Sequence, residues 1–429
     1  MAGLEALQES KAESTEIGHA DLLMAIPVPL GSEALAPTIA KLLRACKLLS
    51  TPCRIVLALP GENSQATPAE LPQASPEPAS ERPLRYVNYP LPAALPGTIP
   101  WLPNAATYRE IARLATKLDA RACTVLGTDS GFTRDSLTPD KLTLLVDPGI
   151  EGSFDLVLPL YTTQAFDDLV NKSILYPLTR TLYGHRVQNP LGTEFQMSSK
   201  LFPVLSAYAL RDSSQQQGRL PWLATIAANR NLKICQVQLG ARRPSSSDGI
   251  ELSDALAQLT GPLFLDMEDN AAFWQRIRGS HDAPIFGAAS ASASAETIGT
   301  VDVRPMVEAF HLGERNLREI WSLILPPVTL LELKKLSRLS PDEFQMPDTL
   351  WARIVYDFAL AHRLRNINRT HLFGALTPLY LGWVASYAVE INRSGIAAAQ
   401  QRIEQLARAY ESEKPYLLSR WRWPDRFHP

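Results

Sequence analysis

Acids and arginines in turn-rich segments are the residues of this chain that could do chemistry. Asp129 lies in the polar turn Gly127 to Gly131, and Glu194 follows a Pro-Leu-Gly turn. Pro and Gly fix the backbone geometry of such turns, and an acid buried there needs a partner. An Asp in a turn also commonly bonds to its own backbone. Each acid therefore has a structural interpretation beside a ligand-binding one.

Other polar residues have the same double interpretation. Asp167 is either the N-cap of the following helix or a catalytic acid. Arg242 and Arg243, in the loop 240–249, are either solvated cations or a bidentate phosphate contact. His185 is either a hydrogen-bonded turn histidine or a base or ligand. Spacing alone does not decide between these interpretations.

Composition and motifs exclude several classes of protein. The net charge of -2, from 42 basic and 44 acidic residues, gives no long-range attraction for nucleic acid or anionic membranes. The chain contains no nucleophile elbow, phosphate-binding Gly-x-x-x-x-Gly-Lys loop or His-Glu-x-x-His motif. Without Cys-x-x-Cys spacing, reduced and mostly buried thiols are expected at the four cysteines, Cys46, Cys53, Cys123 and Cys235.

The location of the protein is predicted from two absences in the sequence. No run approaches the roughly 18 uninterrupted apolar residues of a membrane helix, so no membrane span is predicted. Residues 1–20 carry acids and no apolar core, so they are predicted to be a frayed polar lead and not a secretory signal. We expect a cytoplasmic protein.

Apolar runs alternate with helical stripes over residues 21–285, which predicts an α/β domain with a mostly parallel sheet. The turn 127–131 then falls at the carboxyl end of a strand, where open α/β sheets bind ligands. A further apolar run covers residues 142–146. Strands are predicted at 21–29, 54–59, 84–89, 122–126, 156–160 and 233–239, and helices at 32–49, 105–118, 166–182, 198–210, 222–228 and 251–264.

Composition also predicts the domain boundaries. Residues 63–82 are rich in Pro, Ala, Ser and Glu and are expected to form an exposed loop. An Ala/Ser linker at 286–300 then separates the α/β domain, 21–285, from an α-helical region, 301–429. In the helical region the stripe containing Trp351 is expected to be core, Asp348 to cap a helix, and Pro378 to kink or begin one. Arg180, in the α/β domain, is expected to make a structural ion pair.

The chain resembles a known enzyme family at several quoted segments. The resemblance is carried by Tyr176-Pro177-Leu178-Thr179-Arg180, Leu182-Tyr183-Gly184, Asn189-Pro190-Leu191-Gly192, Leu350 to Phe358 and Leu376 to Gly382. These segments are similar to the retaining mannosylglycerate and glucosylglycerate synthases, which have a GT-A glycosyltransferase fold. The resemblance covers nearly the whole chain.

The resemblance implies a function and a site. Such enzymes transfer a hexosyl unit from a nucleotide sugar to glycerate or a similar small acceptor, with a divalent metal, Mg²⁺ or Mn²⁺, bridging the diphosphate. Carried over to this chain, it implies Glu194 and Asp167 as catalytic residues and Asp129 as metal ligand. The positions implied in donor binding are Asp129, Thr128, Glu62, Arg242 and Arg243.

The chain departs from the family pattern where the chemistry needs charge. Gly127 replaces the first acid of the Asp-x-Asp element, and Thr163 and Gln164 replace a basic pair. Leu220 replaces an acid ahead of a tryptophan, and residues 241–246 contain no metal-binding histidine. The metal site is therefore incomplete. A pseudoenzyme that acts as a binding or scaffold partner is the alternative, and a homo-oligomer formed through the helical region is a third interpretation.

Overall fold

The protein is described by a computed structural model of the 429-residue chain. The described residues are 19–27, 32–51, 53–61, 85–90, 105–127, 138–208, 221–241, 250–288 and 300–424. The predicted lead at 1–20, except for its last two residues, and the predicted loop at 63–82 lie outside them.

Contacts divide the chain into two compact units. We call the first, Met1–Thr162 with Gly192–Ser245 and Ala283–Ala291, the sheet unit. The second, Thr163–Leu191 with Ser246–Asp282 and Ser292–Pro429, is the helical unit. This division does not coincide with the boundary predicted at 286–300, because helices from the middle of the chain pack on C-terminal ones.

The sheet unit contains an eight-stranded mixed sheet in the order β10-β8-β5-β7-β4-β1-β2-β3. Only β7 is antiparallel to its neighbours, β4 and β5, and the other pairs are parallel. This confirms the predicted α/β class and mostly parallel sheet. The strands are β1 (Leu22–Ala25), β2 (Ile55–Pro60), β3 (Arg85–Tyr89), β4 (Ala122–Val125), β5 (Leu156–Thr162), β7 (Phe195–Ser198), β8 (Ile234–Ala241) and β10 (Ile285–Phe286).

All six predicted strands are present, and β7 and β10 were not predicted. β7 has four residues and occupies the centre of the sheet, between β5 and β4. So short a strand carries almost no periodicity of its own, and it forms because both neighbours supply hydrogen-bonding partners. The helix predicted from residue 198 begins as a 3-10 turn at Ser199–Leu201 and continues as α6 (Phe202–Tyr208).

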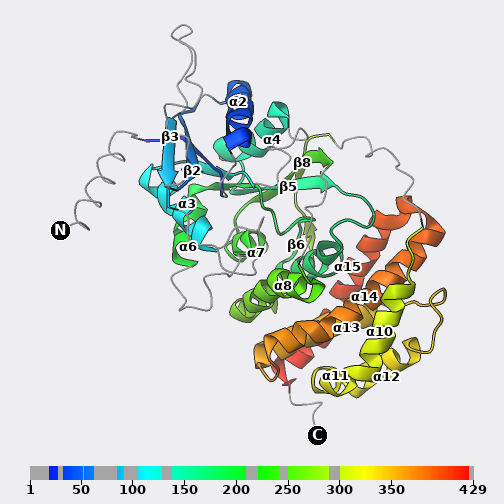
Figure 1. Ribbon diagram of the computed structural model, residues 1–429. Helices are drawn as coiled ribbons and strands as arrows, with labels where there is room; N and C mark the ends of the chain where they lie inside the picture. Colours follow the sequence, from blue (N-terminus) through cyan, green and yellow to red (C-terminus); the bar gives the residue numbers. More distant parts are fainter. Residues whose placement is uncertain are drawn as a thin grey trace. The chain divides into compact units, whose positions relative to one another are not determined.

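Helices cover both faces of the sheet (Figure 1). α4 (Pro139–Ile150) lies on one face, where the buried Gln196 side chain of β7 donates to the Val146 carbonyl at 2.6 Å. The apolar run at 142–146 belongs to this helix. α3 (Ala105–Lys117) lies on the other face, where the ring of Tyr108 is 5.5 Å from that of Phe195. α2 (Ser32–Leu48) packs with α4, α6 packs with α3, and α7 (Leu223–Asn229) contacts β5 and β8.

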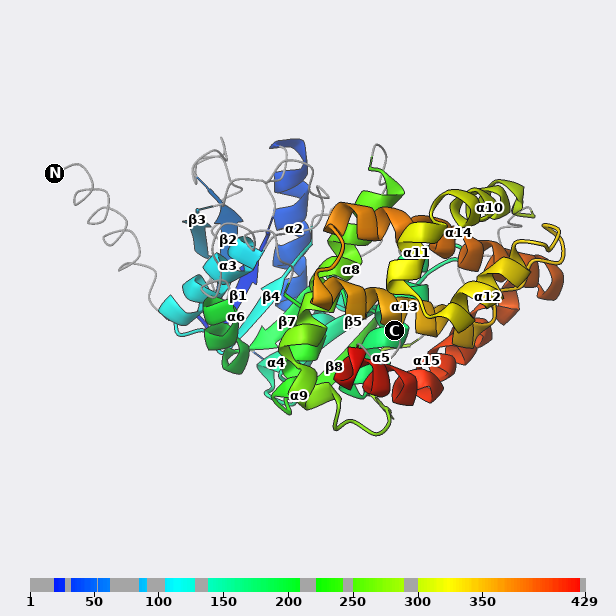
Figure 2. The same ribbon diagram turned by 90° about the horizontal axis from the view of Figure 1, so that it is seen from below.

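The helical unit is built around α14 (Arg369–Ser394), which packs against α8 (Leu252–Asp269), α10 (Arg304–Asn316) and α13 (Asp348–Leu364). By length and mean hydropathy α14 could cross a membrane, but 78% of its most apolar window is buried in this unit. Pro378 lies inside α14 and begins no helix. The unit also contains α9 (Ala271–Trp274), α11 (Arg318–Ile324), α12 (Pro327–Leu336) and α15 (Ala399–Arg422) (Figure 2).

Two predictions for the helical unit have clear outcomes. The Trp351 stripe is buried as expected, and the Trp351 indole donates to the Ser173 carbonyl at 3.0 Å. The cap predicted at Asp348 is wrong, because α13 begins at Asp348 and Pro347 is its N-cap. The Asp348 carboxylate instead accepts both terminal nitrogens of Arg402 at 2.6 Å each.

Candidate functional site at the carboxyl edge of the sheet

The order of the strands defines where a ligand would bind in the sheet unit. The chain runs outward from β1 to β2 and β3, and then crosses back to β4 on the other side of β1. The connections that follow β1 and β4 therefore leave in opposite directions. In open α/β sheets, ligands bind at such a switch point, beyond the carboxyl ends of the strands.

Most of the predicted site residues follow strands that end at this edge. Glu62 comes two residues after the end of β2, Thr128 and Asp129 come shortly after β4, and Arg242 and Arg243 come directly after β8. These five residues lie outside the described ones, so their roles stay predictions. The structure describes the strand end that precedes each of them.

Glu194 reaches the same edge from the opposite chain direction. Because β7 is antiparallel, its first residue, Phe195, pairs with Val125 at the carboxyl end of β4. Glu194 directly precedes Phe195 and is fully buried, with 0% of its surface exposed. The Thr193 hydroxyl donates to its Oε2 atom at 2.9 Å. The antiparallel strand thus places a buried carboxylate at the switch point.

Gly127 has no side chain, and the Glu194 carboxylate lies next to the position that a side chain there would occupy. A Cβ atom at position 127 would lie 3.1 Å from the Thr193 side chain and 3.2 Å from Glu194 Oε1. Both distances are tighter than ordinary van der Waals contact. Gly127 is therefore next to an acid that lies 67 positions later in the sequence.

The Glu194 carboxylate lies near a buried phenol. Tyr108, on α3, is buried beside it, and burial together with the Glu194 carboxylate raises the pKa of the Tyr108 phenol. A carboxylate in such surroundings can accept hydrogen bonds from sugar hydroxyls or bind a cation. In this conformation its surface does not reach solvent.

Two further polar residues at this edge were missed by sequence reasoning. The Gln238 amide of β8 donates to the Thr162 hydroxyl at the end of β5, at 3.0 Å. Next to this contact the register shifts: Leu160 and Tyr161 of β5 pair with Gln238 and Gly240 of β8, so Leu239 is the extra residue of a bulge in β8, beside Gly240 with a φ of 89°. The signal was present in the sequence: Gln236 and Gln238 interrupt the apolar run of β8 at alternate positions.

Asp167 closes a turn in the helical unit. Its carboxylate accepts the Gln164 backbone N–H at 2.9 Å, and its own N–H donates to the Gln164 carbonyl at 3.2 Å. The N-cap interpretation is not borne out, because the carboxylate bonds to a residue before it and not to the helix that follows. Asp167 belongs to the helical unit and Glu194 to the sheet unit.

Lys172 supplies a positive charge to this turn. Its ammonium donates to the carbonyls of Gln164, at 2.6 Å, and Ala165, at 3.4 Å. Burial lowers the pKa of Lys172, and the nearby Asp168 and Asp167 oppose that shift. Sequence reasoning missed this residue because its contact spans eight positions across a turn.

The described residues contain no group of three or more His, Cys, Asp or Glu side chains that could hold a metal ion. Asp129 is outside that set, so the Mg²⁺ or Mn²⁺ implied by the resemblance stays a prediction. The four cysteines are free, and three of them are buried, as predicted. Burial raises the pKa of the Cys46 and Cys235 thiols to about 12, so neither is a nucleophile at neutral pH.

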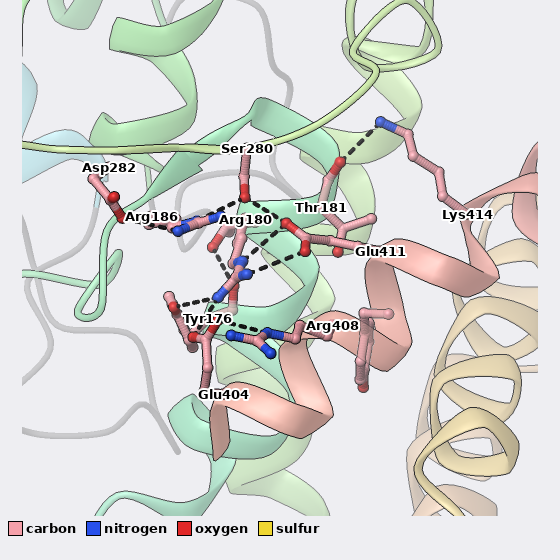
Figure 3. Close-up of polar contacts among 12 residues, drawn as sticks. Tyr176, Arg180, Thr181, Arg186, Ser280, Asp282, Glu404, Arg408, Glu411 and Lys414 are labelled. Carbon is pink, nitrogen blue, oxygen red and sulfur yellow. Dashed lines mark hydrogen bonds and ion pairs between the residues drawn. The ribbon is translucent and has the colours of Figure 1, made fainter. Parts of the chain in front are cut away.

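The Tyr-Pro-Leu-Thr-Arg motif has a structural role, as expected for Arg180. Its guanidinium donates to Glu404 at 2.6 Å, to Glu411 at 2.9 and 3.1 Å, and to the Tyr176 hydroxyl at 2.9 Å (Figure 3). Arg180 is 1% exposed. The motif therefore joins α5 (Tyr176–Tyr183) to α15.

Comparison with known proteins adds no family. No family model matches the chain, and no curated protein matches it. A solved structure described as a mycobacterial protein is 16% identical, and the match covers 60% of this chain and 77% of that one. Its TM-score is 0.33, which is too low to carry an argument about fold or function.

Proposed function

We propose that the protein is a cytoplasmic glycosyltransferase of the GT-A type that transfers a hexosyl unit from a nucleotide sugar to a small polar acceptor such as glycerate. The observation that carries the proposal is the position of the Glu194 carboxylate, directly before β7 and next to the carboxyl end of β4 at the switch point of the sheet. Open α/β sheets bind their ligands at the switch point. The sequence resemblance independently predicts an acid near the sugar at Glu194.

Strand connectivity supports a donor site at the same edge. The segments that carry Glu62, Thr128, Asp129, Arg242 and Arg243 each continue from a strand whose carboxyl end lies there. Arginine forks suit a diphosphate, and an aspartate suits a bridging Mg²⁺ or Mn²⁺. In this proposal Glu194 contacts the sugar, and Asp129 and the two arginines neutralise the leaving nucleotide.

Calorimetric titration with a panel of nucleotide sugars, with and without Mg²⁺ or Mn²⁺, tests the donor site. We expect one donor to bind, with an affinity that increases when the metal is present. Replacing Glu194 by Gln removes a charged acceptor and should weaken that binding about tenfold or more, because a charged hydrogen bond contributes roughly 1.5–3 kcal/mol. Absence of heat with every donor would rule the proposal out.

Glu151→Gln is the matched control for this titration. Glu151 is an exposed acid of the sheet unit whose carboxylate accepts the Ser50 hydroxyl at 3.0 Å. Its replacement should leave donor binding unchanged. Equal losses in the two variants would point to a general effect on the fold and remove the role given to Glu194.

A pseudoenzyme that binds a partner or serves as a scaffold is the second candidate. It is favoured by the complete burial of Glu194 and by Gly127 at the place of an acid. A transfer assay with a labelled donor and glycerate separates the two. Binding of a donor without transfer to any acceptor supports the pseudoenzyme, whereas a glycosylated product excludes it.

A homo-oligomer formed through the helical unit remains a separate proposal. Several apolar side chains on α10, α11 and α12 are more than half exposed, namely Leu312, Leu323, Val328 and Leu331. Light scattering on the full-length protein, and on a variant with Val328 and Leu331 changed to Ser, would test it. A monomer in both cases contradicts the idea.

A further inference from the structure

Two histidines face each other across a small strand pair in the helical unit. β6 (His185–Arg186) pairs in parallel with β9 (His281–Asp282), with His185 opposite His281 and Arg186 opposite Asp282. The His281 N–H donates to the Gly184 carbonyl at 3.0 Å. The two imidazole rings are 4.2 Å apart between centroids, at an interplanar angle of 66°.

Both strands precede points where the chain leaves the helical unit. After β6 the chain enters the sheet unit at Gly192, two residues before Glu194. After β9 it enters the sheet unit at Ala283 and continues into β10. The strand pair therefore ties together two of the segments through which the chain passes from one unit to the other.

The carboxylates around the strand pair are already engaged. Asp282 accepts Arg186 at 3.1 Å, and Glu411 accepts Arg180 and the Ser280 hydroxyl (Figure 3). The Arg186 Nε also donates to Ser280, at 3.0 Å.

The other charged groups packed around this region are mostly cations. Lys414 of α15 donates to the carbonyls of Thr181 and Ile277 at 2.8 Å each. Arg278 lies close enough to Lys414 for electrostatic repulsion between the two cations. Glu404 is held by Arg180 and Arg408. A proton added to the histidine pair would therefore meet positive charge or carboxylates that already have a partner.

His185 is held in the neutral state at physiological pH. Burial, together with the neighbouring His281 ring, lowers the pKa of His185 to about 4. The His281 ring beside it is exposed, with its centroid 4.2 Å from that of His185. A proton on His185 would place a positive charge in this half-buried position, where burial disfavours it.

We propose that His185 and His281 form an acid-sensitive clasp, which holds β6 and β9 together at neutral pH and releases them on acidification. Release frees the two chain segments that lead to Glu194 and to β10. The proposal stands on the strand pair and its histidines, and it does not depend on the transferase function.

Besides the rings, the two strands are joined by their backbone pairing, by the Arg186–Asp282 ion pair and by the Arg186–Ser280 hydrogen bond, and Lys414 bonds to the segments that precede both strands. The backbone pairing covers only two residue pairs. The Arg186–Asp282 ion pair has side-chain exposures of 36% and 80%, and exposed pairs of this kind contribute little. In this proposal a proton on the buried His185 ring shifts the equilibrium toward the unpaired strands.

Amide hydrogen exchange of the wild-type protein tests the clasp directly. Exchange rates are corrected for the intrinsic effect of pH and expressed as protection factors. From pH 7 to pH 4.5, protection of His185 to Val187 and of His281 to Ala283 should fall on the order of 50-fold, from linkage between the bound and released histidines. Amides of Val355 to Ala359, inside α13, should keep theirs. Unchanged protection in β6 and β9 would overturn the proposal.

His281→Gln and the control His371→Gln separate the clasp from general acid sensitivity. His371 is an exposed histidine of α14, away from the strand pair. Removing the His281 ring should raise the pKa of His185, read from its imidazole proton shifts, and reduce the pH dependence of β6 protection. His371→Gln should change neither. The same pH dependence in His281→Gln as in the wild type would contradict the proposal.

Discussion

At the residue scale, the side chain of Glu194 fits only because position 127 is a glycine. Glycine at 127 has no side chain to collide with Thr193 or with the Glu194 carboxylate, which lies 3.2 Å from where a Cβ would be. An acid at 127 and an acid at 194 would compete for one volume and repel each other. The absence of a side chain at 127 is therefore a condition for the arrangement at 194.

Gly127→Asp tests this coupling. The new side chain overpacks the site and adds a second carboxylate, so the free energy of unfolding should fall by about 1–3 kcal/mol, measured by urea denaturation. Glu194→Ala in the same chain should recover part of the loss, as a double-mutant cycle measures. Gly374→Ala is the control, because its Cβ would meet nothing within 4 Å and a helix interior favours Ala by roughly 1 kcal/mol. A Gly127→Asp protein as stable as the wild type contradicts the coupling.

At the scale of elements, Arg180 joins α5 to α15. Its side chain is 1% exposed, whereas those of its acidic partners Glu404 and Glu411 are 30% and 24% exposed. The arginine lowers the pKa of both carboxyls through its hydrogen bonds, against the opposing effect of burial. The planar fork allows one side chain to bond to both acids and to Tyr176 at once.

Arg180→Met should destabilise the helical unit by about 2–4 kcal/mol, toward the low end because both acids can regain water. Chemical denaturation followed by far-UV circular dichroism measures the change. Arg408→Met provides the comparison: Arg408 contacts Glu404 from a position 71% exposed, so its loss should cost less than about 1 kcal/mol. Similar losses in both variants would argue against a structural role for the buried arginine.

At the scale of the whole molecule, a buried acid links folding to pH. Asp357 of α13 is 1% exposed and accepts the Arg420 Nε at 3.0 Å and the Tyr416 hydroxyl at 2.7 Å. Burial raises the pKa of Asp357 to about 6 from 3.8, although Arg420 and Tyr416 oppose the shift. The folded state therefore binds this proton more tightly than the unfolded chain does.

The stability that this proton contributes is complete below about pH 4 and is lost as the pH rises through about 6, because the native pKa is the higher one. The change amounts to about 3 kcal/mol at most. His185 acts in the opposite direction, since its lowered pKa removes stability as the pH falls from 6.5 toward 4. A single melting curve therefore does not separate the two groups.

Asp357→Asn isolates the acid, because the amide keeps the shape and does not titrate. As the pH rises from 4 to 6, the unfolding free energy of the wild type should fall relative to that of the variant. Urea denaturation at intervals of half a pH unit measures it. A difference that is constant with pH would show that Asp357 stays ionised throughout.

The sequence by itself determined what depends on neighbouring residues. Apolar runs and helical stripes predicted six strands, the α/β class and a helical C-terminal region, because side-chain periodicity follows local backbone geometry. Burial of the Trp351 stripe and the ion pairing of Arg180 were also predicted, since large apolar surfaces and long cations in amphipathic helices have few alternatives.

Only the tertiary structure decided what depends on residues distant in the chain. β7 becomes a central strand because Phe195 to Ser198 pair with residues 122–125. Asp348 is an ion-pair partner and not a cap because Arg402, 54 positions away, reaches it. Glu194 lies beside Gly127 for the same reason. The antiparallel pairing of β7 brings the two residues into contact although they are 67 positions apart, and no local pattern encodes the partner of a short strand.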